Sequence, residues 1–538
     1  MEPWYKEAIF YELNVRAFMD ANGDGIGDLQ GVIQRLDYLQ WLGVDCIWLL
    51  PIYPSPLCDD GYDISDYRDV HPNYGSIEDL KKLVVEVHRR GMRLILDLVI
   101  NHTSDQHPWF QMARADPNSP YRNYYVWSDT DQKYTQARII FIDSEESNWS
   151  WDDKAGQYYW HRFYRTQPDL NYDNPRVQEE IFDVMRFWLD IGIDGFRVDA
   201  VPYLFEREGT NCENLTETHA FLKKMRAFVE NEYPQCLLLC EANQPLADLL
   251  HYFGGDLNDP NVRGDEFHMG FHFPLMPRIF MSLKKGTAEE IKKVLTSTPA
   301  LPKNCQWGIF LRCHDELTLE MVSEEERQWM WENYAPDKQM RLNLGIRRRL
   351  APLLDNDLRK TLLAHSLLFT LPGSPFLYYG DEIGMGERLD LADRNGLRTP
   401  MQWDDSIYSG FSTVQPYAPF PEGDYSPGKL NVLLQQGNSN SLLNQLRDMI
   451  KIRKQIGVFG SGEFEWGTHD NPHLAVYWRS LAAKKVVVVN NLSANVQRFQ
   501  FSCVPLSQWR DLITNITFQV EEIHLPPYGF LWLCPLDE

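Results

Sequence analysis

Three short apolar segments of this chain each end in a carboxylate, and this arrangement limits the fold more than any other feature. The segments occupy residues 195–199, 237–241 and 309–315. An apolar run of four or five residues is typical of a fully buried strand, whereas a carboxylic acid at its end does not help packing. Acids at the carboxyl ends of several parallel strands are the pattern of a (β/α)8 barrel, which places its chemistry at that face. We therefore expect the three carboxylates to meet at one mouth of a barrel.

Strand and helix patterns alternate along most of the chain, as they do in a parallel sheet wrapped by helices. In the first hundred residues we expect strands near 9–15, 46–50 and 94–99, with helices over 29–41 and 77–90. The alternation stops after residue 102 and resumes near residue 171. The sequence thus predicts an α/β fold, a (β/α)8 TIM barrel built from residues 1–102 and 171–458.

Three further segments interrupt or follow the barrel pattern. Residues 103–170 are rich in Trp, Tyr, Asn, Asp and Gln and show no helical period, so we expect a small domain inserted after strand 3. Residues 316–356 are heavily charged and are predicted to be a helical, lid-like insertion after strand 7. Short alternating strands dominate residues 459–538 and predict a C-terminal antiparallel β-sandwich.

The bulk composition argues against several classes of partner. The formal net charge of −24 gives a surface that repels nucleic acid and anionic membranes, and no apolar run approaches the length of a membrane span. The nine Cys are odd in number and none form a Cys-x-x-Cys pair, which favours reduced thiols over a disulfide framework. Since the N-terminus also carries no signal-peptide pattern, we expect a cytoplasmic protein.

Several blocks of the sequence are similar to the α-amylase family of glycoside hydrolases and transglycosylases, in order along nearly the whole chain. They are residues 59–63, 97–102, 195–199, 241, 314–315 and 398–403. The resemblance implies a role for each of the three acids. Asp199 would be the nucleophile, Glu241 the general acid/base and Asp315 the third carboxylate.

The chemistry of a retaining glycosidase agrees with these roles. Such an enzyme needs two carboxyl groups about 5 Å apart, one as nucleophile and one as acid/base. Arg197 lies two residues before Asp199 on the same side of the strand, so its positive charge is expected to keep Asp199 ionised. Glu241 follows an apolar strand, so desolvation is expected to raise its pKa. Asp315 is expected to hold sugar hydroxyls and to stabilise the transition state.

The same blocks supply the residues expected to bind the terminal glucose: Asp59, Tyr62, His102, Arg197, His314 and Arg398. Asp59 and Arg398 are expected to pair across the closed end of the pocket, with Arg394 as the alternative to Arg398. The two histidines would donate hydrogen bonds to the sugar, and Tyr62 would offer a stacking face. A pocket blocked in this way acts on the terminal glucose of a small sugar rather than inside a polymer.

A loop over residues 20–28 has oxygen-bearing side chains at alternate positions around a glycine turn, a pattern that suits calcium. Its expected ligands are Asp20, Asn22, Asp24, the Ile26 carbonyl and Asp28. The loop is not a full EF-hand because its twelfth position is Gly31 rather than Glu, and a turn without metal stays open as the alternative. A second calcium site is implied by the resemblance alone, with Asn101, Asp169, Tyr203, the Leu204 carbonyl and Glu206 as ligands. No organic cofactor is expected.

Within the family, several segments resemble the members that isomerise maltose to trehalose: residues 11–18, 138–141, 147–149, 200–210, 241–244 and 314–322. The resemblance implies retaining, intramolecular glucosyl transfer through a covalent glucosyl-enzyme, with minor hydrolysis to glucose. Arg138 and Asn243 are candidate contacts to the second glucose, and Glu316 and Glu320 are weaker ones. Cys313 departs from the family, which usually has Asn before the His-Asp pair.

Two other functions stay open at this point. An α-glucosidase or oligo-1,6-glucosidase would use the same groups with water as the acceptor. A non-enzymatic binding barrel is disfavoured, because such relatives lack the acids and carry a membrane anchor. The expected partner is a small disaccharide, maltose or trehalose, while a homo-oligomer and a separate maltokinase chain are left open.

Overall fold

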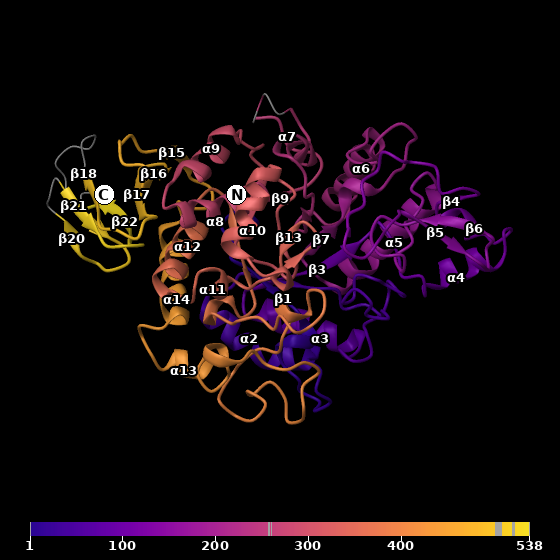
Figure 1. Cartoon of the computed structure of the whole chain (residues 1–538), viewed down its shortest axis with the longest axis horizontal. Helices are drawn as coiled ribbons and strands as arrows, with labels where there is room; N and C mark the ends of the chain where they lie inside the picture. The colour runs from indigo at the N-terminus through magenta and orange to yellow at the C-terminus, as the bar shows by residue number, and fades with distance from the viewer. Residues whose placement is uncertain (1, 257–258, 260, 501–507, 519–521, 537–538) are drawn as a thin grey trace.

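The structure, a computed structural model, describes the chain except residues 1, 257–258, 260, 501–507, 519–521 and 537–538. Among the described residues, eight parallel strands close into a barrel in the order β1-β14-β10-β9-β8-β7-β3-β2. These strands are β1 Phe10–Leu13, β2 Cys46–Leu49, β3 Arg93–Val99, β7 Gly195–Asp199, β8 Leu237–Cys240, β9 Met269–Phe271, β10 Gln306–Phe310 and β14 Ser374–Tyr378. The closed parallel barrel confirms the predicted fold class (Figure 1).

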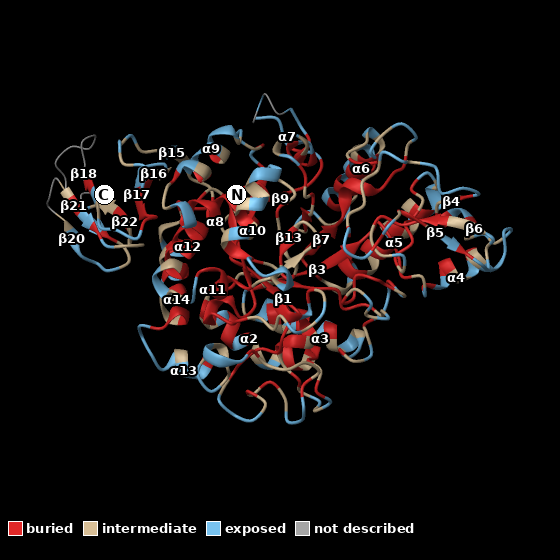
Figure 2. Ribbon diagram, viewed as in Figure 1, coloured by how far each residue is buried: buried red, intermediate tan, exposed pale blue. Residues whose placement is uncertain are grey.

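Helices surround the barrel strands. The longer ones are α2 Leu29–Leu42, α3 Ile77–Arg89, α5 Pro175–Ile191, α6 Thr216–Glu232, α8 Leu275–Lys285, α9 Glu289–Ser297, α12 Leu358–Thr370 and α14 Leu442–Ile456. The shorter ones are α1 Val15–Phe18, α7 Leu246–Leu249, α11 Leu350–Leu353 and α13 Val432–Gln436. The barrel strands and the inner sides of the helices are buried, while the outer turns are exposed (Figure 2).

Helix α3 shows how the local sequence sets these elements. Ser76 accepts a hydrogen bond from the Asp79 N–H, and the Asp79 carboxylate accepts one from the Ser76 N–H, which is a complete capping box. The buried face of the helix includes Leu80, Leu83 and Val87, and the helix packs against β3. The apolar spacing that predicts this helix is therefore the face that holds it on the barrel.

Aromatic side chains fill the barrel beneath its mouth. The rings of Phe10 and Phe376 stack with centroids 4.2 Å apart, and the Phe271 ring lies 4.9 Å from that of Phe376. Trp48 completes the layer, with its ring 5.7 Å from that of Phe271. All four side chains are buried, so the interior of the barrel is a packed core and not a channel.

A glycine lets β7 and β8 approach closely. Gly195 begins β7 with a φ of +141°, and a Cβ at this position would lie 2.2 Å from the Leu237 carbonyl oxygen. A larger residue would therefore push apart the two strands that carry the first two acids of the site.

The segment inserted after β3 forms a small unit of its own. Its three-stranded antiparallel sheet has the order β4-β6-β5, formed by Trp127–Ser128, Gln157–Trp160 and Trp149–Asp152. It also contains helix α4, Pro108–Ala115, which the sequence analysis did not predict. His107 caps this helix by accepting from the Trp109 N–H, and Pro108 begins it. Eight residues are too few for a clear helical period.

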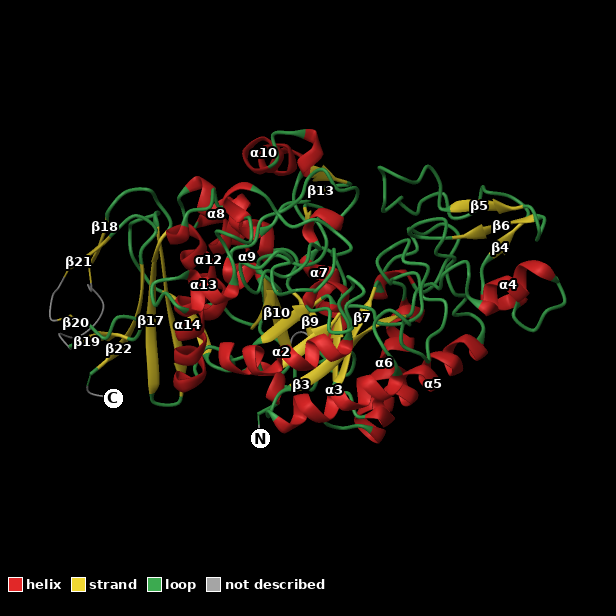
Figure 3. Ribbon diagram, turned by 90° about the horizontal axis from the view of Figure 1, so that it is seen from below, coloured by secondary structure: helices red, strands yellow, loops and turns green. Residues whose placement is uncertain are grey.

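The segment 316–356 is helical only in part. Helix α10, Glu324–Tyr334, starts at a Ser323 capping box. The same segment also contains a small antiparallel sheet in the order β11-β13-β12, formed by Leu317–Thr318, Gly345–Ile346 and Arg341–Leu342. Strands of two residues are too short to show an alternating pattern, so the sequence did not indicate them. Figure 3 shows α10 and β13 on one side of the barrel strands and the N-terminus on the other.

The C-terminal part is antiparallel. One sheet has the order β15-β16-β17-β22-β19-β20, and a second pairs β18 with β21. The strands are β15 Glu463–Trp466, β16 Leu474–Leu481, β17 Lys484–Asn491, β18 Gln497–Gln500, β19 Trp509–Asp511, β20 Thr517–Phe518, β21 Glu522–Leu525 and β22 Phe530–Pro535. Val487, Phe499 and Ile523 share one apolar cluster between the two sheets. Within the described ranges, no helix combines the length and the apolar character that crossing a membrane requires.

Candidate active site

The three predicted acids line one cavity at the carboxyl ends of the barrel strands. Asp199 ends β7, Glu241 follows β8, and Asp315 lies just beyond β10. Arg197 Nη1 contacts Asp199 Oδ1, and Arg197 Nη2 lies 2.9 Å from Glu241 Oε2. One guanidinium therefore holds two of the carboxyl groups side by side. The cavity holds about 1160 Å³ of empty space, its open mouth included, which is the size range of a small-molecule site.

The protonation of the first two acids differs in the way that retaining chemistry needs. Burial raises the pKa of Glu241 to about 7, against the opposing charge of Arg197. Burial also raises the pKa of Asp199, although Arg197 lowers it. A hydrogen bond between the two carboxyl groups raises the pKa of Glu241 and lowers that of Asp199. The proton between them therefore belongs to Glu241, which can act as the acid while Asp199 offers a free oxygen.

Asp315 is held by three cationic groups. Its Oδ1 lies 2.9 Å from Arg394 Nε and 3.0 Å from Arg398 Nη2, and its Oδ2 lies 3.1 Å from His314 Nε2. Burial raises the pKa of Asp315, but the charges of His314 and Arg394 outweigh burial and hold it well below its usual value. Asp315 is therefore a fixed negative charge at the mouth of the barrel, as a group that stabilises an oxocarbenium-like transition state must be.

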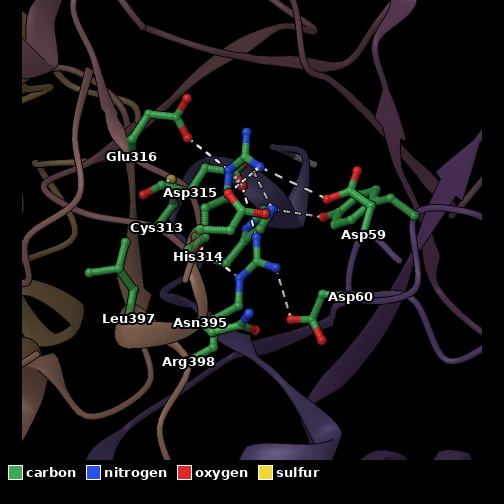
Figure 4. A network of polar contacts seen from close by, with 12 residues as sticks. Asp59, Asp60, Cys313, His314, Asp315, Glu316, Asn395, Leu397 and Arg398 are labelled. Atoms are coloured by element: carbon green, nitrogen blue, oxygen red, sulfur yellow. Dashed lines mark hydrogen bonds and ion pairs between the residues drawn. The ribbon is translucent and has the colours of Figure 1, made fainter. Parts of the chain in front are cut away.

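The predicted pair of Asp59 and Arg398 is wrong. Arg398 Nη1 lies 3.0 Å from Asp60 Oδ2, and Arg398 is 2% exposed beneath the site (Figure 4). Asp59 Oδ1 instead lies 3.9 Å from Arg394 Nη1, and both of these residues line the cavity. The backbone of Asp60 has a φ of +50°, and this turn sends the two adjacent carboxylates to different arginines. Of the two arginines considered as partners of Asp59, Arg394 lines the cavity and Arg398 does not.

Two of the predicted sugar contacts form one stacked pair. The rings of Tyr62 and His314 lie 5.3 Å apart and are nearly parallel, at 11°. The Tyr62 hydroxyl donates to Asp97 Oδ2 at 3.1 Å and lies 2.9 Å from His314 Nε2. His102 also lines the cavity, and its buried Nε2 has no hydrogen-bond partner among the described residues. Burial lowers the pKa of His102 to about 3, so this ring is neutral and available to a sugar hydroxyl.

The residues predicted to contact the second glucose lie in two different places. Asn243 lines the cavity, donates from Nδ2 to Thr318 Oγ1 at 3.1 Å, and has a buried Oδ1 without a partner in the described part of the chain. Glu316 and Glu320 also line the cavity. Arg138 is not among the lining residues. It is the bridge between the inserted domain and the 316–356 segment.

A set of polar contacts joins the two insertions beside the cavity. Arg138 Nη1 lies 2.6 Å from Glu320 Oε2, and Arg138 Nε lies 2.9 Å from Glu213 Oε1 in the loop after β7. Nearby, the Asn343 N–H donates to Asp143 Oδ2 at 2.7 Å. The Arg138–Glu320 and Asp143–Asn343 contacts join the inserted domain to the 316–356 segment, and both insertions contribute residues to the cavity lining. We refer to the Arg138–Glu320 and Asp143–Asn343 contacts as the roof.

The loop predicted as a first calcium site is a hydrogen-bonded turn. Asp20 accepts from the Gly23 and Gly25 N–H groups at 2.7 and 2.8 Å, and Asp28 caps α2 by accepting from the Gly31 N–H at 2.7 Å. Asn22 and Asp24 each accept from a nearby backbone N–H, and the Ile26 N–H is the donor to Asp24. Asp20 Oδ2 also accepts from the Ser412 hydroxyl, and Asp28 Oδ2 accepts from the Ala21 and Asn22 N–H groups. These two oxygens therefore have both lone pairs engaged, and the turn is hydrogen-bonded without a cation.

The second predicted calcium site has a different character. Asn101 Oδ1, Asp169 Oδ2 and Glu206 Oε1 are buried without a hydrogen-bond partner among the described residues. Burial raises the pKa of Asp169 to about 8, and burial with the charge of Asp169 raises the pKa of Glu206 well above its usual value. Tyr203 and Leu204 precede Glu206 in the same loop. Unpaired buried oxygens destabilise a fold, and a hard cation with oxygen ligands would satisfy them.

Only two of the five candidate ligands are carboxylates. Within the residues that the structure describes, no group of three or more His, Cys, Asp and Glu side chains is placed to hold a metal. The remaining candidate ligands are an amide, a phenol and a backbone carbonyl. The fit therefore rests on the three unpaired oxygens.

Sequence reasoning missed four residues of the site. Asp60 holds Arg398, Glu213 holds Arg138, and Asp97 accepts from Trp48 Nε1 at 2.8 Å and from Arg197 Nη1 at 2.7 Å. Glu12 lines the cavity from β1 and accepts hydrogen bonds from His314. Glu12 and Asp97 carried a signal that could have found them, because each is a lone acid in the apolar run of a buried strand, Ile9–Leu13 and Leu94–Val99.

Comparison with known proteins agrees with this geometry. A model of the alpha amylase catalytic domain matches residues 13–462, and a model of the maltogenic amylase C-terminal domain matches residues 464–532. The solved structure of trehalulose synthase from Pseudomonas mesoacidophila superposes with a TM-score of 0.79 at 28% identity, covering 99% of this chain and 100% of that one.

Curated relatives narrow the comparison further. Trehalose synthase/amylase TreS from Mycobacterium tuberculosis is 54% identical, over 98% of this chain and 90% of the relative. Trehalose synthase from Pimelobacter sp. is 53% identical, over 91% and 87%. Oligo-1,6-glucosidase from Heyndrickxia coagulans is more distant, at 33% identity over 96% of both chains. This chain therefore belongs to the alpha-amylase family and, within it, to the trehalose synthases.

Proposed function

We propose that this protein is an enzyme that isomerises maltose to trehalose by retaining, intramolecular glucosyl transfer, with minor hydrolysis to glucose. The similarity to trehalose synthases over nearly the whole chain supports the reaction. The paired carboxyl groups on Arg197 support the retaining course. The expected partner is a small disaccharide.

The first step breaks the glycosidic bond of maltose. A carboxylate oxygen of Asp199 attacks the anomeric carbon of the non-reducing glucose and forms a covalent ester. As the bond from that carbon to O4 of the second glucose breaks, Glu241 gives its proton to the leaving oxygen. Asp315 and His314 hold the hydroxyls of the terminal glucose, and the charge of Asp315 stabilises the positive ring of the transition state.

The second step forms trehalose from the same two sugars. The released glucose turns within the cavity until its anomeric hydroxyl faces the ester. Glu241, now ionised, takes the proton of that hydroxyl, and the oxygen attacks the anomeric carbon as the bond to Asp199 breaks. Two inversions at this carbon give the α,α-1,1 linkage, and the enzyme returns to its starting protonation state.

The roof is the observation that favours an isomerase over a hydrolase. The released glucose must attack the ester before water does and before it leaves the cavity. The cavity must therefore retain the sugar and limit the access of water. The Arg138–Glu320 ion pair and the Asp143–Asn343 contact join the two insertions beside the cavity. Asn243 offers an unpaired buried oxygen inside the chamber for a hydroxyl of the turning glucose.

Incubation with maltose in the presence of excess ¹³C-labelled glucose tests this proposal. Intramolecular transfer predicts trehalose that carries almost no label, because the acceptor is the glucose just released. Label in most of the trehalose would show an open acceptor site. Glucose as nearly the sole product would favour the alternative, an α-glucosidase or oligo-1,6-glucosidase with water as acceptor.

We also propose that Asn101, Asp169, Glu206, Tyr203 and the Leu204 carbonyl hold a calcium ion. The three unpaired buried oxygens support this set. A bound dication would neutralise the two carboxylates and fasten the start of the inserted domain to the loop after β7. The 20–28 loop remains a second, weaker proposal for calcium. For location we propose the cytoplasm, supported by the free thiols of the described cysteines.

A further inference from the structure

A buried acid on the first barrel strand touches the site from behind. Glu12 lies on β1 between Trp48 of β2 and Tyr378 of β14 in the strand register. Its side chain is 2% exposed and reaches the cavity wall. Its Oε1 accepts from the His314 N–H at 3.0 Å and lies 2.5 Å from His314 Nδ1. Glu12 thus fixes both the backbone and the ring of the residue before Asp315.

The other ring nitrogen of His314 faces acceptors too. His314 Nε2 lies 3.1 Å from Asp315 Oδ2 and 2.9 Å from the Tyr62 hydroxyl. That hydroxyl gives its own proton to Asp97, so it can only accept from His314. Both ring nitrogens must therefore donate, and a histidine that donates from both is an imidazolium.

The charges around the ring agree with this state. Burial lowers the pKa of His314, but the charges of Asp315 and Glu12 outweigh burial and raise it to about 10. The ionisable groups that face His314 come from several elements: Glu12 of β1, Tyr62 of the loop after β2, Asp97 of β3, Cys313 and Asp315 of its own loop, and Arg398, whose Nε donates to the His314 carbonyl.

We propose that Glu12 is a positioning residue of the reaction, which keeps His314 as a doubly donating imidazolium and so fixes Asp315 and the hydrogen bond that His314 offers to the terminal glucose. Glu12 itself need not touch the sugar. Without its charge, His314 could lose the Nδ1 proton or turn its ring, and Asp315 would lose one of its three cationic partners. This inference rests on the proposed function only in so far as the first step involves Asp315.

The test replaces Glu12 by Gln, which keeps the shape and an oxygen acceptor but removes the charge. The first step is followed with p-nitrophenyl α-glucoside, whose cleavage reports glucosyl transfer whichever acceptor follows. We expect kcat/KM to fall by about tenfold. A fall of one unit in the pKa of His314 makes its protonated form about tenfold less favoured. The His314 ring is followed by ¹³C NMR of labelled histidine, assigned with a His314→Gln variant. Its titration midpoint should fall by roughly one to three pH units.

Glu382→Gln is the matched control. Glu382 is also a fully buried carboxylate behind the site, held by the Tyr11 and Tyr38 hydroxyls at 2.8 and 2.7 Å. Its replacement removes a buried charge of the same kind but does not touch His314. We expect a lower Tm without a shift in the His314 midpoint. Glu12→Asp, which keeps the charge, should retain more activity than Glu12→Gln and should keep the raised midpoint.

The proposal is overturned if His314 titrates at the same pH in Glu12→Gln and in the unaltered protein, or if both Glu12 variants lose only thermal stability. These outcomes are separate from the fate of the proposed function. If the unaltered protein makes glucose rather than trehalose from maltose, the isomerase proposal fails, while the comparison of the variants on p-nitrophenyl α-glucoside stays interpretable.

Discussion

Arg138 of the inserted domain and Glu320 of the 316–356 segment lie 2.6 Å apart, Nη1 to Oε2, and join parts of the chain separated by 182 residues. Neither residue touches the three acids. Their contact joins the two insertions beside the cavity, which Glu320 lines, and Glu213 holds Arg138 in place from the loop after β7. We therefore expect that the product ratio can be altered at these residues while the three acids stay in place.

Replacing Arg138 by Ala should raise the ratio of glucose to trehalose made from maltose. The change opens the roof while the acids stay in place. An ion pair of this kind contributes up to about 1 kcal/mol, which corresponds to a roughly fivefold change in the ratio. The ratio is read by chromatography of the products. Arg165→Ala removes another ion pair of the inserted domain, to Glu145 at 3.2 Å with Arg165 63% exposed, and should leave the ratio unchanged.

Asn243→Ala should also raise the ratio of glucose to trehalose. Its unpaired Oδ1 in the cavity is the group that we expect to guide the released glucose. Cleavage of p-nitrophenyl α-glucoside should change little, because that step needs no sugar acceptor. An unchanged product ratio would remove Asn243 from the acceptor site.

Asp199→Asn should reduce turnover of maltose by a factor on the order of a thousand or more, because an amide cannot form the ester. The fold should stay intact by circular dichroism, since Arg197 keeps its contacts with Asp97 and Glu241. Asp183→Asn, a change at an exposed acid of helix α5, serves as the control. Retained activity in Asp199→Asn would contradict its role as the nucleophile.

The pH dependence of kcat/KM should have an alkaline limb set by Glu241, whose pKa burial raises to about 7. The acid works in its protonated form, so activity is present below this pH and is lost as the pH rises through it. With α-glucosyl fluoride, whose leaving group needs little protonation, Glu241→Gln should lose that limb. If the limb persists in this variant, another group sets it.

Removal of calcium should lower the Tm by several degrees, since a ligand that binds only the folded state stabilises it. Mass spectrometry of the protein before and after chelation counts the bound ions. Glu206→Gln should lose one ion and show little further loss of Tm on chelation. A protein that contains no calcium and shows no change of Tm with EDTA would rule out both proposed sites.

The sequence was sufficient for the barrel and for the convergence of its acids, because apolar strands and the face on which they end follow from local pattern. It was not sufficient for the choice between Asp59 and Asp60. The two adjacent aspartates carry the same side chain and differ in the backbone turn between them. The residue type of Asp60 does not predict its positive φ. Asp60 therefore pairs with Arg398, and Asp59 lies near Arg394.

The roof contacts and the partner of Glu12 were beyond sequence reasoning for a related reason. Arg138 and Glu320 are surface-type residues in segments of irregular pattern, and only the folded chain shows that they meet. Glu12 contacts a residue 302 positions away. A lone acid in a buried strand predicts a partner, but spacing alone cannot name it.

The packed rings of Phe10, Phe376 and Phe271 close the inner end of the cavity. In the proposed reaction, maltose must therefore arrive and trehalose must depart through the same open mouth of the cavity. A contact that delays the escape of the glucose released in the first step also delays the release of trehalose. Passage through this mouth then limits turnover. A variant with a wider mouth that turns over faster should therefore also release more free glucose.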